Sequence, residues 1–449
     1  MTSTTSAPTR RMPVPDGTIP VGIALLIAGV ATYAFLRIGA IGVGGDDEFA
    51  PIVSLWFATF ALAPGFFLPL EQELGRALAH RRATGDGTLP VIQKVVRLGA
   101  GLVAVVVIVI LIASPLITSG YFRGDWWMLI ALVGTFMAYA PAHLARGVCS
   151  GSGRFKDYAI ILGSDGVVRI VLCVALAVVG VTATGAYGLA IAVSPLFAVA
   201  YVWRRGALRP IPRTDGSGVT VDDGSEASWS EVTPNLGWLL LGSVFAATLL
   251  NAGPITMSLL ADDSEQAFVT TFSYGVLLAR VPLFLFQAVQ AALLPGLSRL
   301  AARGELVEFR AGMKRLAAVV VAVGVLGTGG AFLLGPFAIE LVYKAELGGR
   351  TLAVLALASG VYMMALALAQ AVIALKGHAL VAVGWGIGVA TFVLVTWLGS
   401  DDLFRRIEYG LFTSSVVAMI AFGIALKYKL DSGIGPDQDS LMDAATPRK

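Results

Sequence analysis

Two arginines stand in the middle of long apolar runs, where a charge needs a partner. Arg280 lies near the centre of the run 267–290, and Arg169 lies near the centre of the run 158–180. An ionised side chain at the centre of a bilayer costs about 2.5–3.5 kcal/mol on insertion scales. A guanidinium stays ionised and donates two parallel hydrogen bonds to an anionic group. We therefore predict that Arg280 and Arg169 bind an anion.

Asp165 is an alternative partner for Arg169. It lies four residues earlier on the same helical face, so the two side chains can neutralise each other. A role as a proton-coupling carboxylate is the alternative for Asp165. Contact of Arg169 with substrate and pairing with Asp165 both stay open. Asp165 and Arg37, which closes the first apolar run, complete the candidate binding set.

Prolines and small residues mark candidate hinges. Asn251, Gly253 and Pro254 interrupt the run 236–258, and Pro282 follows Arg280 by two residues. Proline removes one hydrogen bond of a helix and can expose backbone groups to a cavity. These residues are predicted to bend during alternating access. A static kink that neighbouring helices satisfy is the alternative.

The elements that position these residues are membrane helices. The 449 residues are 57% apolar and 14% charged, against about 25% charged in a soluble domain. This composition excludes a soluble globular protein. Because about 20 apolar residues span a bilayer, an all-α polytopic membrane protein with twelve transmembrane helices is predicted. The expected spans are 21–43, 50–70, 96–118, 126–146, 158–180, 183–203, 236–258, 267–290, 316–339, 351–375, 379–399 and 409–427.

Charge sets the orientation. With the N-terminus inside, the inner segments hold 24 of the 32 Lys and Arg residues and the outer segments hold 6. Basic residues prefer the cytoplasmic side, so both termini are predicted to be cytoplasmic. A segment rich in Gly, Ser, Asp and Pro reads as a flexible cytoplasmic linker at 204–235. It separates an N-terminal lobe of six helices (1–203) from a C-terminal lobe (236–430), and a disordered tail (431–449) follows.

The two lobes form an internal repeat. Leu144 and Gly153 recur 224 residues later as Leu368 and Gly377, and both pairs close the fourth helix of their lobe. Six helices per lobe make the repeats parallel, an arrangement of transporters that hold substrate between the halves. Accidental matches in an unrelated twelve-helix protein are the alternative.

Motifs for other chemistry are missing from the sequence. Cys149 and Cys173 have no CxxC spacing, no HExxH occurs, and no glycine-rich phosphate loop opens a helix. No metal site, ATP site or other cofactor is therefore predicted, and nucleic acid is not expected as a partner.

Four stretches resemble a known family: LRIG at 36–39, LEQELGRALAHRRATG at 70–85, LARGVCSGSGRFKDYAIIL at 144–162 and LLARVPLFLFQAVQAALLPGLSRLAARG at 277–304. They are similar to the polysaccharide (O-antigen) flippase branch of the multidrug/oligosaccharidyl-lipid/polysaccharide exporter superfamily. The resemblance implies two six-helix lobes around a central cavity in a bacterial plasma membrane. It further implies that the protein flips a polyprenyl-diphosphate-linked sugar outward for envelope polysaccharide synthesis, so Arg280 and Arg169 would hold the diphosphate. Membrane lipids, a polysaccharide polymerase or glycosyltransferases are the implied partners.

Three alternatives belong to other functional classes. Asp46, Asp47 and Glu48 follow the first span, as acidic residues do in membrane glycosyltransferases that use polyprenyl-phosphate sugars, although the outer loops are short for such an enzyme. A cation-coupled drug exporter of the same superfamily is disfavoured because no acidic residue falls inside the first four expected spans. Asp165 is the only acid placed inside any span. A scaffold for polysaccharide assembly is the third alternative.

Overall fold

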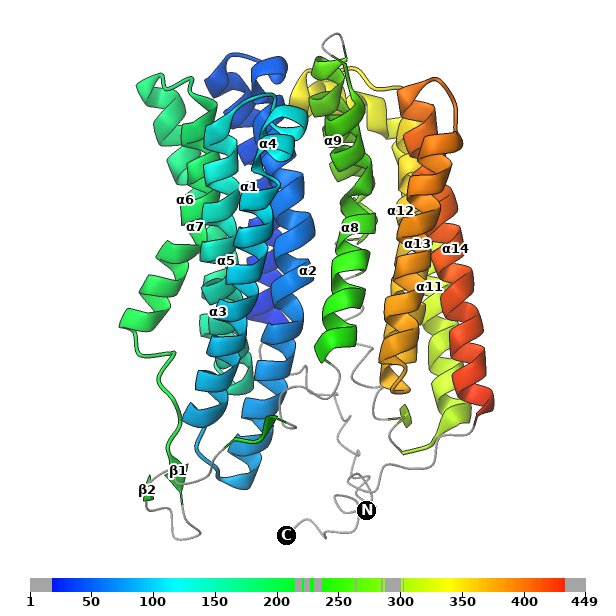
Figure 1. The fold of residues 1–449 in the computed structure, drawn as a ribbon. Coiled ribbons are helices and arrows are strands. Elements are labelled where there is room, and N and C mark those ends of the chain that lie inside the picture. Colours follow the sequence, from blue (N-terminus) through cyan, green and yellow to red (C-terminus); the bar gives the residue numbers. More distant parts are fainter. Residues whose placement is uncertain are drawn as a thin grey trace, which may run out of the picture.

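A computed structural model describes residues 18–214, 220–221, 227–229, 236–262, 265–283, 286, 300–301 and 303–432. The predicted all-α fold is confirmed: long helices run side by side in two lobes (Figure 1). The described strands are β1 (Arg213–Thr214) and β2 (Thr220–Val221), which form a short antiparallel ribbon. Eleven helices of the described chain are long and apolar enough to span a membrane, and α9 with the residues after it occupies the position of the eighth predicted span.

The first lobe contains six long helices and a short connection. Its long helices are α1 (Thr18–Val43), α2 (Asp46–Thr84), α3 (Leu89–Ile112), α5 (Trp126–Gly151), α6 (Phe155–Val179) and α7 (Thr184–Arg204). Between α3 and α5 lie α4 (Ser114–Leu116) and the π-helical turn η1 (Ile117–Tyr121). Both cysteines are buried in this lobe.

The second lobe repeats the pattern. Its helices are α8 (Leu236–Leu260), α9 (Gln266–Ala279), α11 (Leu306–Tyr343), α12 (Gly349–Ala374), α13 (His378–Leu398) and α14 (Leu403–Asp431). Side chains on the outside of both lobes are apolar, including Ile112, Val178 and Leu326. In a bilayer these side chains meet lipid rather than water.

Two helices are much longer than their predicted spans. α2 continues fourteen residues past the expected end at 70, and α11 begins ten residues before the expected start at 316. Hydropathy detects only the part of a helix that lies in hydrocarbon, whereas the extensions are rich in Ala, Leu, Glu and Arg, which favour helix in water. α2 ends where Gly85 adopts the left-handed conformation at φ 79°.

The expected interruption of the seventh span is wrong. α8 runs unbroken through Asn251, Gly253 and Pro254, all of which are buried. Pro254 has no N–H for the carbonyl of Leu250, four residues earlier, so that oxygen needs another donor. By contrast, the helix beside Pro282 does break: α9 ends at Ala279 and a turn at Arg280 follows. Bending of any of these residues during transport stays a prediction.

The described parts of the linker are docked on the first lobe, which the prediction of a flexible segment did not anticipate. The backbone N–H of Thr88 donates to the carbonyl of Ile211 at 3.0 Å, and Ala207 is buried. Lys94 donates to the carbonyl of Ala227 and lies 4.9 Å from the ring of Trp229. The rest of the linker and residues 433–449 of the predicted disordered tail lie outside the described residues.

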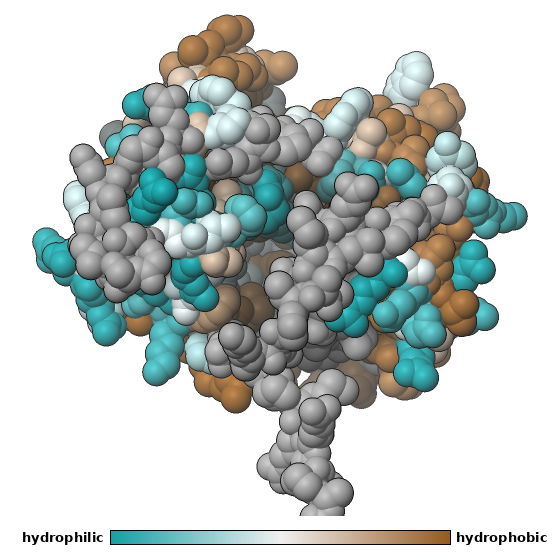
Figure 2. All heavy atoms as spheres, turned by 90° about the horizontal axis from the view of Figure 1, so that it is seen from below, coloured by the Kyte–Doolittle hydropathy of each residue, from teal (hydrophilic) through white to brown (hydrophobic). Residues whose placement is uncertain are grey.

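The two lobes meet along α2 and α8, from Ser54 and Ser258 near one end of the molecule to Pro64 and Ser243. We call the end that carries the α2–α3 turn and the linker the linker face, and the opposite end the distal face. α2 and α8 pack together along the contact between the lobes, which diverge toward the linker face (Figure 1). Viewed from the linker face, the molecule has a recess between the lobes (Figure 2). The packing therefore closes the distal face and leaves the linker face more open.

Candidate functional site

Arg169 is enclosed within the first lobe. Its guanidinium donates to Asp165 one turn earlier on α6 and to the hydroxyl of Tyr139 on α5 at 3.1 Å. It also lies over the rings of Trp56 (4.8 Å) and Phe60 (5.3 Å) of α2. Only 3% of the side chain is exposed. The pairing with Asp165 considered from the sequence is thus formed, and the charge of Arg169 is balanced by its own lobe.

Arg280 is buried against α8 and has neutral partners. Its guanidinium donates to the side-chain oxygen of Asn251 at 3.0 Å and to the backbone carbonyl of Leu250. That carbonyl is the one that Pro254 deprives of its helical donor, so the proline creates the acceptor that Arg280 uses. No carboxylate pairs with Arg280 among the described residues. Its charge is therefore stabilised by dipoles and not by an opposite charge.

The two arginines do not share one cavity. Arg280 lies 5.6 Å from the ring of Phe57, whereas Arg169 lies over Trp56 and Phe60. These three aromatic residues fall within little more than one turn of α2, and no described ring contacts both arginines. Arg280 lines a cavity to which Arg169 does not contribute. That both arginines hold one substrate stays a prediction.

A small cavity adjoins Arg280. It encloses about 30 Å³, enough for about one water molecule. Tyr362, Ser359 and Ser415 supply polar groups to its lining. The Tyr362 hydroxyl donates to the carbonyl of Ala246 at 3.0 Å, so it is already bound. In the closed arrangement of the distal face, this space is too small for a lipid headgroup.

Arg37 lies apart from both, at the distal contact between the lobes. Its guanidinium donates to the carbonyl of Tyr343 of the second lobe at 3.3 Å and acts electrostatically on Asp46. The ring of Tyr343 stacks on Tyr274 with centroids 3.9 Å apart, and the Tyr274 hydroxyl donates to Asp46 at 3.1 Å. Arg37 therefore belongs to a group of interlobe contacts and not to a common site with Arg169 and Arg280.

Further bonds fasten the same contact. Ser54 of α2 donates to Ser258 of α8 at 2.8 Å, and Tyr33 of α1 donates to the carbonyl of Leu277 of α9 at 3.0 Å. Tyr121 donates to the carbonyl of Ser54 at 2.8 Å, and burial raises the pKa of its phenol, which keeps it protonated as a donor. We call Arg37, Asp46, Ser54, Ser258, Tyr274 and Tyr343 the distal latch.

The acidic triplet considered for a glycosyltransferase opens a helix. Asp46, Asp47 and Glu48 form the first turn of α2, where negative charge favours the helix dipole. The side chain of Asp46 is engaged with Tyr274, and its carbonyl accepts from Thr270 at 2.8 Å. Within the described residues, no three His, Cys, Asp or Glu side chains form a group suited to a metal ion.

A buried polar cluster escaped the sequence analysis. Glu71 of α2 accepts from Arg146 at 2.8 Å and from Tyr158 at 2.9 Å, and its carboxylate lies 2.8 Å from Nδ1 of His143. Glu71 and His143 are each about 95% buried. The prediction that Asp165 is the only acid inside a helix is thus wrong. A second case is Glu408, which is buried in α14 and lies 3.5 Å from Arg350.

The cluster was missed because the second and fourth spans were ended too early. The expected spans end at 70 and 146, so the sequence predicts Glu71 in a loop and Arg146 at a helix end, whereas α2 continues to Thr84 and α5 to Gly151. The spacing of His143 and Arg146 in the sequence gives a signal for this cluster. His143 and Arg146 are one turn apart in the expected fourth helix, so both project to one face and require an acid opposite them.

Comparison with known proteins gives relatives of similar length. No family model matches the chain. An uncharacterized protein of Mycobacterium tuberculosis (strain ATCC 25618 / H37Rv) is 23% identical over 412 residues, which cover 89% of this chain and 88% of the relative. An uncharacterized protein of Mycobacterium bovis matches to the same extent. Both relatives are similar to this chain in length, and their descriptions give no function.

Solved structures give the fold. An inward-facing multidrug resistance MATE family transporter of the MOP superfamily matches with a TM-score of 0.67 at 14% identity, covering 95% of this chain and 100% of that one. An outward-facing form gives 0.63 at 13% identity, covering 93% and 96%. The Vibrio cholerae MATE transporter VcmN, in a mutant form, gives 0.64 at 15% identity, covering 93% and 97%. The chain therefore has the fold of MATE transporters, with two lobes.

Proposed function

We propose that the protein is a membrane transporter that moves an anionic amphiphile by alternating access, and that this amphiphile is a polyprenyl-diphosphate-linked sugar. The observation that carries the proposal is the uncompensated charge of Arg280 at the contact between the lobes. Arg169, at similar depth, has Asp165 as its counter-ion, whereas Arg280 has only neutral acceptors. A diphosphate that enters between separating lobes would supply the missing negative charge.

The closed latch and the loop charges support transport from the inner to the outer leaflet. The distal latch seals one face, and the linker face carries most of the basic residues, which favours a cytoplasmic position for that face. The fold of inward- and outward-facing transporters supports a cycle in which the latch opens as the linker face closes. A lipid-linked sugar would then load from the inner leaflet beneath the latch and leave after it opens.

The test is a flipping assay on the full chain in proteoliposomes. A fluorescent polyprenyl-diphosphate N-acetylglucosamine is placed in one leaflet, and its arrival in the other is followed with an added galactosyltransferase. We expect flipping that Arg280→Gln reduces tenfold or more. Arg315→Gln, which removes an exposed guanidinium of α11, is the matched control and keeps the parent rate. No flipping by the parent protein under any imposed gradient would overturn the proposal.

Membrane potential supplies a second measurement. Moving one charge across 100 mV is worth about 2.3 kcal/mol, so two phosphate charges leaving a negative interior gain about 4–5 kcal/mol. We expect a potassium-diffusion potential, negative inside, to accelerate flipping and its collapse to slow it. A rate that is the same with and without the potential would contradict this coupling.

A cation-coupled drug exporter is the second candidate, and buried carboxylates favour it. Asp165 accepts from Tyr139 at 3.2 Å, and Glu71 of α2 lies beside His143 and Arg146, which follow Tyr139 by one and two turns of α5. The solved neighbours include proteins described as multidrug resistance transporters. Efflux of ethidium driven by a sodium or proton gradient, lost in Asp165→Asn and without lipid flipping, would favour this candidate over the first.

A further inference from the structure

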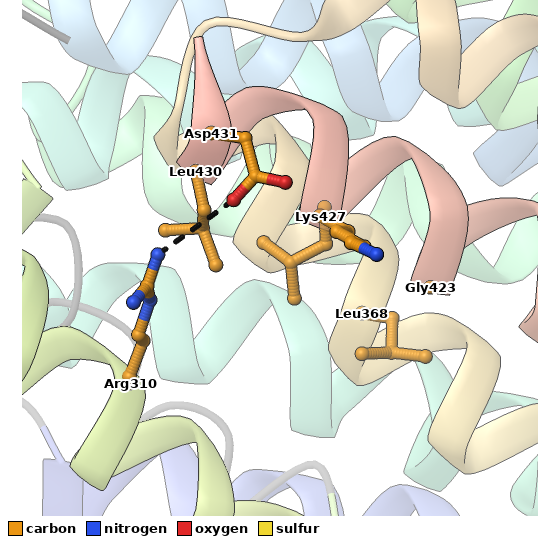
Figure 3. A pocket seen from close by; sticks show the side chains of 7 residues that line it. Arg310, Leu368, Gly423, Lys427, Leu430 and Asp431 are labelled. Carbon is orange, nitrogen blue, oxygen red and sulfur yellow. Dashed lines mark ion pairs between the residues drawn. The ribbon is translucent and has the colours of Figure 1, made fainter. Parts of the chain in front are cut away.

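A groove opens on the second lobe, away from the contact between the lobes. It lies near the linker face between α11 and α14 and encloses about 450 Å³, within the range of ligand sites (Figure 3). The residues that line it come from α11, α12 and α14: Arg310, Leu368, Gly423, Leu426, Lys427, Leu430 and Asp431. None of its lining residues lines the cavity beside Arg280.

The packing of three helices creates the groove. α11 and α14 each pack along α12, and not along each other, so Leu368 of α12 forms a floor between two walls. Gly423 brings no side chain to the wall of α14, and a β-carbon added there would meet no atom within 4 Å. The opening is therefore built into the helix arrangement.

The first lobe closes the related place with its own chain. Leu144, the repeat mate of Leu368, lies against Gly99 of α3, where an added β-carbon would come within 3.1 Å of it. The segment after α7 crosses from α7 to the start of α3, where Ile211 pairs with Thr88. In the second lobe the described chain ends at Ser432, directly after α14.

The lining combines an apolar floor with a basic rim. Leu368, Leu426 and Leu430 supply the apolar surface, and Arg310 and Lys427 are exposed on the two walls (Figure 3). Asp431 lies 3.9 Å from Arg310, a long contact between half-exposed side chains that leaves the rim with one excess positive charge. Such a site suits a ligand with a negative headgroup and a hydrocarbon chain.

The position of the groove identifies the source of that ligand. Arg310 stands in the second turn of α11, and Lys427 in the last turns of α14, where the helices leave the expected hydrocarbon. Exposed Ile420 and Ile424 continue the apolar surface of α14 toward the membrane centre. Phospholipids of the same leaflet have their phosphates at this level and their chains along this surface.

We propose that this groove binds an anionic phospholipid. Its phosphate lies between Arg310 and Lys427, and the first part of an acyl chain lies on Leu368 and Leu430. The site is separate from the one that Arg280 forms with substrate, and the proposal does not depend on the substrate assigned above.

Native mass spectrometry of the detergent-solubilised full chain tests the proposal, with added phosphatidylglycerol and phosphatidylethanolamine as probes. We expect preferential retention of one phosphatidylglycerol. Arg310→Gln combined with Lys427→Gln lowers that retention at least fivefold, and Leu368→Trp, which fills the floor, lowers it as well. Asp431→Asn raises it, since it removes the acid from the rim. Arg315→Gln on another side of α11 is the matched control and retains the lipid.

Several outcomes would overturn the proposal. Equal retention by the parent and by the double variant would show that lipid binds elsewhere. Equal retention of both lipids would exclude recognition of charge. If phosphatidylglycerol is retained only after residues 433–449 are removed, these residues and not a lipid occupy the groove in the full chain. Because Arg310 and Lys427 are exposed, an unchanged unfolding temperature of the double variant separates loss of the site from loss of the fold.

Discussion

Arg169 and Arg280 both lie beside aromatic rings of the same turn of α2, yet their charges have different kinds of partner. Arg169 has a carboxylate one turn away, a phenol and two aromatic rings. Arg280 has an amide oxygen, a backbone carbonyl released by Pro254 and one aromatic ring. The first charge is balanced permanently, whereas the second leaves a positive charge beside the surface that must separate during transport. The comparison teaches that depth alone does not identify a binding residue and that the counter-ion decides.

The largest effect is expected on stability when the balanced pair is broken. Arg169→Met leaves Asp165 buried without its counter-ion, which costs about 3–5 kcal/mol. The double variant Arg169→Met/Asp165→Asn recovers most of this loss, because neither charge remains. Unfolding of the purified protein in a fixed detergent measures both. A double variant as unstable as the single one would show that the pair is not a unit.

A smaller effect, on transport and not on stability, is expected at Arg280. Arg280→Met loses at least tenfold in flipping rate, equivalent to about 1.4 kcal/mol of barrier. The free energy of unfolding changes less than in Arg169→Met, since no carboxylate is left unpaired. The flipping rate and the free energy of unfolding are measured for both Arg280→Met and Arg169→Met. Equal loss of stability in both would remove the distinction between the arginines.

The proline that provides the acceptor for Arg280 can be tested next. Pro254→Ala restores an N–H to α8 that competes for the carbonyl of Leu250, so Arg280 loses about 1 kcal/mol of hydrogen bonding. We expect a change in flipping rate smaller than that of Arg280→Met, with α8 retained. Pro336→Ala, within α11 and away from the contact between the lobes, is the control. Identical rates for Pro254→Ala and the parent would mean that the bond is incidental.

The smallest effect is expected at the distal latch. Its contacts close the distal face and so separate Arg280 from the solvent on that side. Tyr274→Phe removes the hydrogen bond to Asp46, worth about 1 kcal/mol, and so shifts the population toward the open latch about fivefold. Accessibility of Ser258→Cys to a membrane-impermeant thiol reagent reports this opening. Tyr409→Phe, an exposed phenol, serves as the control. Labelling that is equally slow in both variants would argue that other contacts hold the latch.

Much of the fold could be predicted because hydrocarbon imposes its length on the sequence. The apolar run 126–146 lies within α5, and the run 379–399 lies within α13 except for its last residue. The extensions of α2 and α11 could not be located in this way, since a helix that leaves the membrane loses its apolar signal while keeping its hydrogen bonds. The docking of the linker could not be predicted either, because its few apolar residues, such as Ala207 and Leu208, are scattered among polar ones and form no helical or strand pattern.

The candidate site was predicted in part. The depth of Arg169 and Arg280, and the pairing of Arg169 with Asp165, follow from spacing along single helices. The different partners of the two arginines, Tyr139 for Arg169 and Asn251 for Arg280, depend on packing between segments that are distant in sequence. Arg37 was placed with substrate because it is basic and closes a helix, whereas its bond to Tyr343 joins positions 306 residues apart.

The hydroxyl groups of Ser54 and Ser258 lie 2.8 Å apart across the two lobes, and the native cysteines are both buried. This separation places the β-carbons close to the span that a disulfide bridges. Cysteines at these two positions could therefore be cross-linked by a mild oxidant and released by a reductant, with little interference from Cys149 or Cys173. The closed distal face thus offers a place where one covalent bond would hold the whole transport cycle at a single step.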